Sequence, residues 1–177
     1  GYTLLLGTSS TQIINPLASG AATYDAVKDF NLVGMVSINP TCIVVNPSIP
    51  ANNLKDLLNL IKASPGKFAY GSAGPGTITN LTGELFKLQG GKLNVQHVPY
   101  KGGGPAVNDA VAGQIQGTFI GMGGSLPYVQ TKRLRPLAVT TRRRSATGLK
   151  STTVASIAGA TLIVLTFVAW PLIASSV

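Results

Sequence analysis

The stretch Phe68-Ala69-Tyr70-Gly71-Ser72-Ala73-Gly74-Pro75-Gly76-Thr77 joins a short apolar strand to a glycine-rich turn, and a helical pattern over roughly Thr79–Gln89 follows it. Glycines permit positive φ and let the backbone approach a ligand closely. The turn also leads into a helix N-terminus, where amides and the helix dipole attract anions without a cationic side chain. We therefore expect a carboxylate site at this turn, and the alternative is a purely structural turn.

This turn does not match a nucleotide-binding motif. In the Walker sequence a lysine follows the second glycine of G-x-x-x-x-G, whereas Thr77 and Ile78 follow Gly76 here, and the spacing is not G-x-G-x-x-G either. Nothing supplies the phosphate-binding lysine or a magnesium carboxylate, so a nucleotide enzyme is disfavoured.

Units of strand, glycine-rich turn and helix repeat on both sides of this stretch. Leu54–Ala63 has leucine or isoleucine at i, i+3, i+4 and i+7, which predicts an amphipathic helix with Asn53 as its N-cap and Pro65-Gly66 after its end. The repetition argues for a parallel, doubly wound α/β sheet, which places ligands beyond the carboxyl ends of its strands. The further apolar runs are Tyr2–Leu6, Leu32–Ile38, Cys42–Val45, Val95–Tyr100, Ile115–Ile120 and Leu134–Val139, and further helices are expected from Pro105 to Ala112 and over Leu126–Lys132.

Three more loops have the same placement as the turn after Tyr70. Gly7–Thr11, Lys101–Pro105 and Gly121–Ser125 each follow a strand and carry small or hydroxyl residues. Several such loops along one edge of a sheet would form a hydrogen-bonding cleft.

The composition of the 177 residues limits the possible chemistry. The chain is long enough for one domain or two small lobes, and 45% hydrophobic against 11% charged residues excludes a disordered chain. One cysteine, Cys42, excludes an internal disulfide and a zinc cluster. One histidine, His97, five carboxylates and no G-x-S-x-G motif leave few groups for catalysis. We expect no enzyme, no catalytic residue, no cofactor and no metal, and we interpret His97 as a structural strand residue.

The net charge of +9 is concentrated late in the chain, because half of the basic residues lie between Lys132 and Lys150 with no acid among them. This block is either a solvated loop or a surface for an anionic partner. Aromatic residues do not interleave with it, so no nucleic acid is expected as a partner. The uncharged tail Thr153–Ile173 is long enough to span a bilayer but is equally compatible with a buried strand. A membrane-associated protein that uses residues 132–150 and 153–173 is therefore the alternative function.

Several motifs together resemble the substrate-binding proteins of tripartite tricarboxylate transporters, the Bug family. They cover about residues 1–145 in the family's order, and the combination is more specific than any one of them. The matching stretches are Gly1–Gly7 with Ser9-Ser10, Ile14–Pro16, Tyr24-Asp25, Val27–Phe30, Val44–Ser48, Pro65–Lys67, Tyr70–Gly74 with Gly76-Thr77, Gly83–Lys87, His97–Gly102 and Leu134–Thr140.

The resemblance implies a periplasmic-binding-protein-like α/β fold with two doubly wound lobes and a ligand cleft between them. It divides the chain into a partial first lobe at 1–41, a second lobe at 42–141, and a crossover and apolar tail at 142–177 that returns to the first lobe. The protein is then expected in the periplasm, as a monomer that captures a small organic carboxylate and delivers it to the membrane permease subunits of the transporter. The expected ligand-binding residues are Thr8, Ser9 and Ser10 in the first lobe, and Ser72, Gly74, Gly76, Thr77, Lys101 and Gly102 in the second.

The chain also departs from the family pattern. Family members have a leading strand and a P-x-G-G-x-x-D-like loop before the position of Gly1, so we expect this chain to be N-terminally truncated relative to the family. Gly121 stands where members often carry an acidic or amide residue. Residues 152–177 match only loosely.

Overall fold

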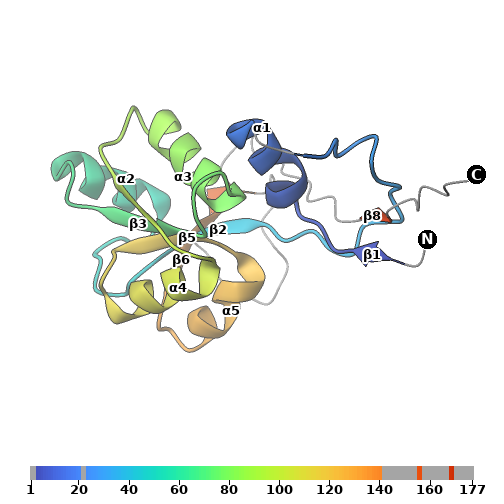
Figure 1. Ribbon diagram of the computed structural model, residues 1–177. Coiled ribbons are helices and arrows are strands. Elements are labelled where there is room, and N and C mark those ends of the chain that lie inside the picture. Colours follow the sequence, from blue (N-terminus) through green and yellow to red (C-terminus); the bar gives the residue numbers. More distant parts are fainter. Residues whose placement is uncertain (1–2, 21–22, 141–154, 157–167, 170–177) are drawn as a thin grey trace, which may run out of the picture. The chain divides into compact units, whose positions relative to one another are not determined.

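The computed structural model describes residues 3–20, 23–140, 155–156 and 168–169 (Figure 1). Contacts divide the chain into two compact units. Unit 1 comprises Gly1–Ile38 and Ile163–Val177, and unit 2 comprises Asn39–Leu162. Within the described ranges, no helix is long and apolar enough to cross a membrane. The basic residues Arg142–Arg144 and Lys150, and nearly all of the apolar tail, lie outside the described residues.

Unit 2 contains a six-stranded mixed sheet in the order β4-β3-β5-β2-β6-β7. Strand β3 is parallel to β4 and β5, β6 is parallel to β7, and β2 is antiparallel to both of its neighbours, β5 and β6. The strands are β2 (Thr41–Val45), β3 (Ala69–Ser72), β4 (Gln96–Pro99), β5 (Gly117–Gly121), β6 (Arg135–Val139) and β7 (Ala155–Ser156).

The prediction of a wholly parallel sheet is wrong at β2. Strands β2 and β3 run in opposite directions, so β2 ends at the edge of the sheet where β3 begins. The segment between them, which contains helix α2 (Leu54–Ala63), starts and finishes at that edge. A helix between two strands is compatible with either strand direction. The alternation of strand and helix patterns therefore did not predict the direction of β2.

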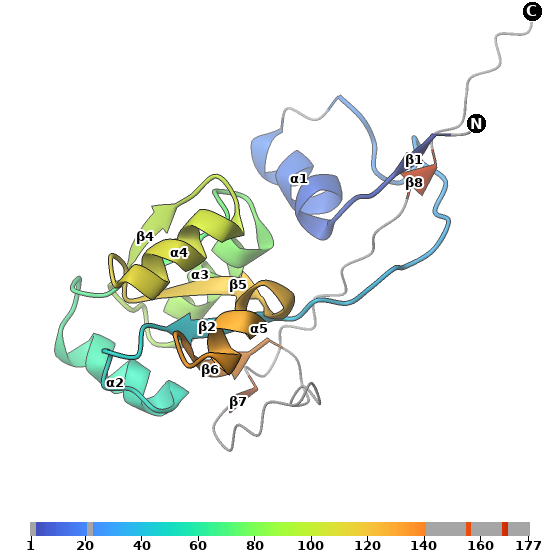
Figure 2. The same cartoon turned by 90° about the horizontal axis from the view of Figure 1, so that it is seen from below.

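Two layers of helices cover the sheet of unit 2 (Figures 1 and 2). On one face, Ile43 and Val45 pack with residues of α2 and α3, and on the other face Cys42 and Val44 pack with residues of α4 and α5. This alternation along β2 is the two-residue period of a strand, and both faces are apolar because both are covered. The remaining helices of unit 2 are α3 (Ile78–Gln89), α4 (Gly103–Ala112) and α5 (Met122–Gln130).

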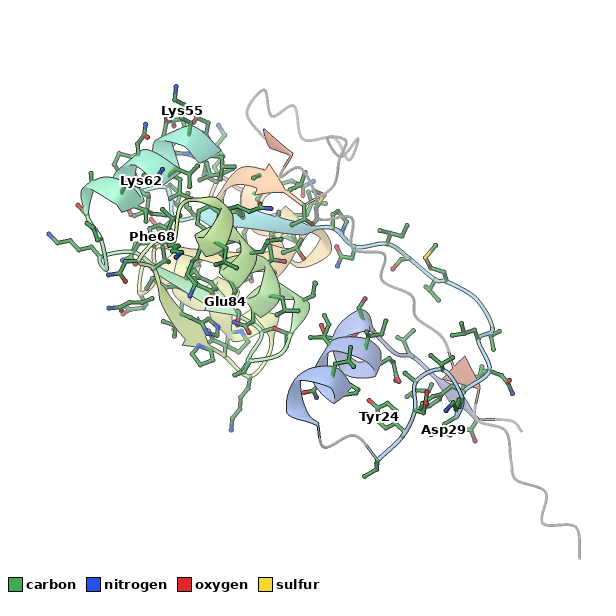
Figure 3. The ribbon with its side chains drawn as sticks, turned by 90° about the horizontal axis from the view of Figure 1, so that it is seen from above. Tyr24, Asp29, Lys55, Lys62, Phe68 and Glu84 are labelled. Carbon is green, nitrogen blue, oxygen red and sulfur yellow. The ribbon has the colours of Figure 1, made fainter. Side chains whose placement is uncertain are left out.

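Helix α2 has the bounds that the sequence predicts. The Asn53 side chain accepts a hydrogen bond from the Asp56 amide at 2.9 Å, which is the predicted N-cap. Leu57 and Ile61 are buried, while Lys55 and Lys62 are exposed on its outer side (Figure 3).

The predicted strands and helices of unit 2 are present, with shifts at their ends. Helix α4 begins at Gly103 rather than at Pro105, and α5 begins at Met122 rather than at Leu126. In both cases glycines that look like loop residues in the sequence form the first turn of the helix.

Unit 1 has little regular structure among its described residues. Strand β1 (Leu4–Leu5) pairs antiparallel with β8 (Val168–Ala169), and a short π-helical segment, η1 (Ser10–Ile14), leads into α1 (Asn15–Ser19). The apolar run Leu32–Ile38 forms neither strand nor helix, so the strand expected there is wrong. An apolar run becomes a strand only where a neighbouring strand pairs with its backbone.

Candidate functional site

Three of the predicted loops lie at one edge of the sheet in unit 2. Because β3, β4 and β5 are parallel, the turns that follow them emerge at their common carboxyl edge. Two backbone hydrogen bonds join the first two turns: the Tyr100 amide donates to Ser72 O and the Gly102 amide to Ala73 O, each at 3.1 Å. The expected site residues Ser72, Gly74, Gly76, Thr77, Lys101 and Gly102 are therefore brought together, whereas Thr8, Ser9 and Ser10 belong to unit 1.

The turn Ser72–Thr77 needs two of its glycines. Gly74 has φ +124° and Gly76 has φ +67°, a region that other residues rarely adopt. A Cβ atom at Gly74 would also lie 3.1 Å from the carbonyl oxygen of Tyr100. Thr77 is the N-cap of α3, and its hydroxyl donates to Gly74 O at 2.6 Å. The conformation of the turn is thus set by the backbone and by the Thr77 hydroxyl.

The amides of this turn donate mostly to side chains of the protein itself. The Ala73 amide donates to Thr79 Oγ1 at 2.9 Å, the Gly74 amide to Ser72 Oγ at 3.1 Å, and the Gly76 amide to Asn80 Oδ1 at 3.3 Å. A carboxylate that binds these amides must share or displace those side-chain oxygens. The sequence predicted backbone amides that are available to a ligand. In the structure, these amides donate to side chains of the turn and of helix α3.

The first turn of α4 has a different environment. Its N-cap is Gly102, at φ +109°, which provides no side-chain cap. The amides of Gly103 and Gly104 lie where a helix offers no carbonyl of its own, and the exposed Lys101 precedes them. This helix start combines the helix dipole, backbone amides and a nearby cation, which are features that favour an anion. The glycine run before Pro105 was the signal for it in the sequence.

The third helix at this edge, α5, has its first amides occupied. The Met122 amide donates to Pro40 O at 2.9 Å, and the Gly123 amide donates to Asn39 Oδ1 at 3.3 Å. The start of α5 is therefore less available to an anion than the start of α4.

Ser72 lies behind the turn and is fully buried. Its Oγ is 2.7 Å from Nε2 of His97 on β4. The His97 ring stacks on Tyr70, with ring centroids 4.9 Å apart and planes at 25°. Sequence reasoning missed this cluster, because the pairing of Tyr70 with His97 across β3 and β4 follows from sheet register, which no local pattern encodes.

The cluster continues to a charged pair on α3. Tyr70 donates its hydroxyl to Glu84 Oε1 at 2.9 Å, and Lys87 Nζ is 2.7 Å from Glu84 Oε2; Figure 3 shows the position of Glu84 on α3. Burial raises the pKa of the Tyr70 hydroxyl, and its hydrogen bond to Glu84 adds to the rise. Burial also opposes ionisation of Glu84, but the hydrogen bonds from Lys87 and Tyr70 outweigh it and lower the pKa of this carboxyl.

His97 itself is held neutral near pH 7. Burial is the main cause that lowers the pKa of its imidazole, and Lys87 lowers it further, while Glu84 acts in the opposite direction. The cluster therefore consists of a neutral imidazole, a neutral phenol and a paired carboxylate beneath the turn.

Two residues outside this edge, Arg135 and Cys42, make contacts within the fold. Arg135, expected in the basic block, donates to the backbone carbonyls of Ile49 and Ala51 at 3.1 and 3.0 Å. Cys42 is buried and hydrogen-bonded to Ser125. In the part of the chain that the structure describes, no group of three or more His, Cys, Asp or Glu residues could hold a metal ion.

Comparison with proteins of known sequence matches this chain to one family. The profile described as "Tripartite tricarboxylate transporter family receptor" matches residues 1–172. Protein BugT of Bordetella pertussis is 35% identical over 150 residues, which cover 82% of this chain and 44% of BugT. A UPF0065 protein of Pseudomonas sp. strain P51 is 29% identical over 159 residues, 90% of this chain and 47% of that protein. The chain thus spans less than half the length of these relatives.

Comparison with solved structures points to the same kind of protein. A periplasmic transporter has a TM-score of 0.79 and 39% identity over 86% of this chain and 51% of its own. The R. palustris protein Rpa4515, solved with adipate, has a TM-score of 0.81 and 30% identity over 95% of this chain and 56% of its own. BugD, a periplasmic binding protein, has a TM-score of 0.73 and 26% identity over 81% of this chain and 47% of its own.

These matches confirm the predicted family and the α/β fold of periplasmic binding proteins. The family consists of solute-binding receptors rather than enzymes. Because the family profile covers nearly the whole sequence, the chain belongs to the tripartite tricarboxylate transporter receptor family.

Proposed function

We propose that the whole protein is a periplasmic receptor that captures a small organic carboxylate and presents it to the permease subunits of a tripartite tricarboxylate-type transporter. The observation that carries the proposal is the juxtaposition of two strand–turn–helix junctions, Ser72–Thr77 and Lys101–Gly104, at one edge of the sheet. The family match and the adipate-bound relative support a carboxylate as the ligand.

In this proposal the carboxylate binds at the first turn of α4. The Gly103 and Gly104 amides donate to it, and Lys101 adds a positive charge. The Thr77 hydroxyl turns from Gly74 O to donate to the carboxylate from the neighbouring turn. Amides fixed in a helix cost little ordering entropy on binding, and the helix dipole favours the negative charge.

Thr8, Ser9 and Ser10 are proposed as ligand-binding residues of the first lobe. Residues 1–41 would then belong to the first lobe, residues 42–141 would form the second lobe, and residues 142–177 would return to the first. We propose a monomer that performs no catalysis and binds no nucleic acid.

Calorimetric titration with adipate, malate and aromatic acids tests this proposal. We expect saturable binding of at least one of these acids. If the whole protein binds none of them, the proposal is overturned. Thr77→Val is expected to weaken binding by about tenfold or more, since a hydrogen bond to a charged group is lost, and unchanged affinity would remove Thr77 from the site.

Two variants control for the loss of the Thr77 N-cap. Thr77→Ser keeps the hydroxyl and is expected to bind like the parent protein. Thr131→Val removes a threonine hydroxyl at the C-terminal end of α5, where it donates to Pro127 O, and is expected to leave the affinity unchanged. Circular dichroism checks that all three variants retain the fold.

A further inference from the structure

We propose that His97 is a positioning residue for the Ser72–Thr77 turn: its Nε2 sets the direction of the Ser72 hydroxyl hydrogen bond, and protonation of the ring reverses it. The expected effect of His97 on ligand affinity rests on the proposed carboxylate site. The expected effect of His97 on the hydrogen bonds of the turn is independent of that site.

The hydrogen bonds of Ser72 limit where its hydroxyl proton can point. Ser72 Oγ accepts from the Gly74 amide at 3.1 Å, so its own proton is directed either to His97 Nε2 at 2.7 Å or to Gly74 O at 3.4 Å. The shorter contact has the usual length of a strong hydrogen bond and the longer one does not. In the proposed arrangement the neutral ring carries its proton on Nδ1, and Ser72 donates to Nε2 over the shorter of its two contacts.

Protonation of His97 changes this arrangement. Nε2 then carries a proton and donates to Ser72 Oγ, so the serine proton must turn toward Gly74 O. That carbonyl already accepts the Thr77 hydroxyl at 2.6 Å. The Ser72 and Thr77 hydroxyls then both donate to Gly74 O. The protonation state of His97 therefore affects the hydrogen bond of Thr77 through Ser72 and Gly74.

Aromatic and charged groups from two elements face the His97 ring. Tyr70 from β3 stacks on the ring, and α3 contributes Glu84, Lys87 and the Asn80 side chain, whose Nδ2 lies 3.5 Å from both ring nitrogens. Burial and Lys87 favour the neutral ring, against Glu84. An anion bound at the neighbouring turn favours the charged ring, so by linkage a bound carboxylate must raise the pKa of His97.

A ligand-free titration tests the hydrogen-bond switch. His97 is the only histidine of the sequence, so its ring signals in NMR spectra need no further assignment. As the pH is lowered through the titration of the His97 ring, the Gly74 amide signal of the full chain is expected to shift with the same midpoint as the ring. A Gly74 signal that stays constant while His97 titrates would overturn the proposal.

Ser72→Ala separates the hydrogen bond from simple proximity. This change removes one oxygen atom and fits the space that serine occupies. His97 is still expected to titrate in this variant, but the Gly74 amide should no longer follow it. If the Gly74 shift persists unchanged in Ser72→Ala, Ser72 does not transmit the effect.

The ligand arm uses adipate as the probe. The His97 midpoint is expected to rise when adipate saturates the protein, and adipate binding that leaves the midpoint unchanged contradicts the coupling to the site. No adipate binding counts against the proposed function with this acid, while the ligand-free titration still decides the role of His97.

Two substitutions at the ring itself distinguish positioning from packing. His97→Gln keeps an amide that can hydrogen-bond to Ser72 without titrating, and is expected to retain adipate affinity within about twofold. His97→Phe keeps an aromatic ring against Tyr70 but loses the hydrogen bond, and is expected to bind about tenfold less tightly. Equal affinities of the two variants would mean that packing alone matters.

Discussion

At the scale of single residues, Gly83 is required for the packing of Tyr70. A Cβ atom at this position of α3 would lie 2.4 Å from Cε2 and Cζ of the Tyr70 ring, which is fully buried and cannot move without disturbing His97 and Phe119. We expect Gly83→Ala to lower the free energy of unfolding by about 1–3 kcal/mol, as overpacked cores do, measured by urea denaturation.

Gly124→Ala is the matched control for that substitution. Gly124 is an exposed glycine of α5 whose added Cβ would meet only ordinary contacts, at 3.6 Å or more from Ile120. Alanine favours a helix over glycine by about 1 kcal/mol, so this variant should be as stable as the parent or slightly more stable. A Gly83→Ala protein as stable as Gly124→Ala would contradict the packing argument.

At the scale of elements, α2 depends on its N-cap. Asn53 accepts from the Asp56 amide at 2.9 Å and donates its own amide group to the Asp56 carboxylate at 2.9 Å. Asn53→Ala removes both bonds and is expected to cost about 1 kcal/mol in free energy of unfolding. Asn59→Ala, at an exposed position on the same helix, should leave the free energy of unfolding unchanged. Thermal unfolding of the two variants and the parent protein measures the difference.

The sequence predicted elements well where the signal is local. The i, i+3, i+4, i+7 pattern of apolar residues, Asn53 as N-cap and Pro65-Gly66 located α2 to the residue, because caps and amphipathic faces are formed by neighbours in the chain. The direction of β2, the loss of a strand at Leu32–Ile38 and the contact of His97 with Ser72 depend on which strands pair. Pairing partners lie far apart in the sequence, so periodicity could not predict them.

At the scale of the whole molecule, the two units differ in how much apolar surface they bury. Among the residues of unit 1 whose burial the structure describes, Phe30 is the only buried hydrophobic one, whereas unit 2 has a core on both faces of its sheet. Large side chains such as Leu17 and Val27 are more than 80% exposed. Sequence patterns were accordingly most informative for unit 2, where each apolar stripe has its packing partner within the unit.

Cys42 provides a probe for the opening of unit 2. It is the only cysteine of the sequence, it lies in β2 between β5 and β6, and its side chain contacts Ile120 O and Ser125 Oγ. Burial raises the pKa of its thiol to about 11. Because the thiolate is the species that reacts, a disulfide reagent at pH 8 should label the native chain far more slowly than the chain unfolded in guanidinium.

Labelling then reports the population of the open sheet. When the sheet recloses faster than the reagent attacks, the labelling rate follows the equilibrium between closed and open forms. Gly83→Ala should therefore accelerate labelling by about the factor by which it lowers the folding equilibrium constant, and Gly124→Ala should not accelerate it. Rapid labelling of the native parent chain would mean that β2 is accessible without unfolding of the sheet, and it would contradict the central position of β2 in unit 2.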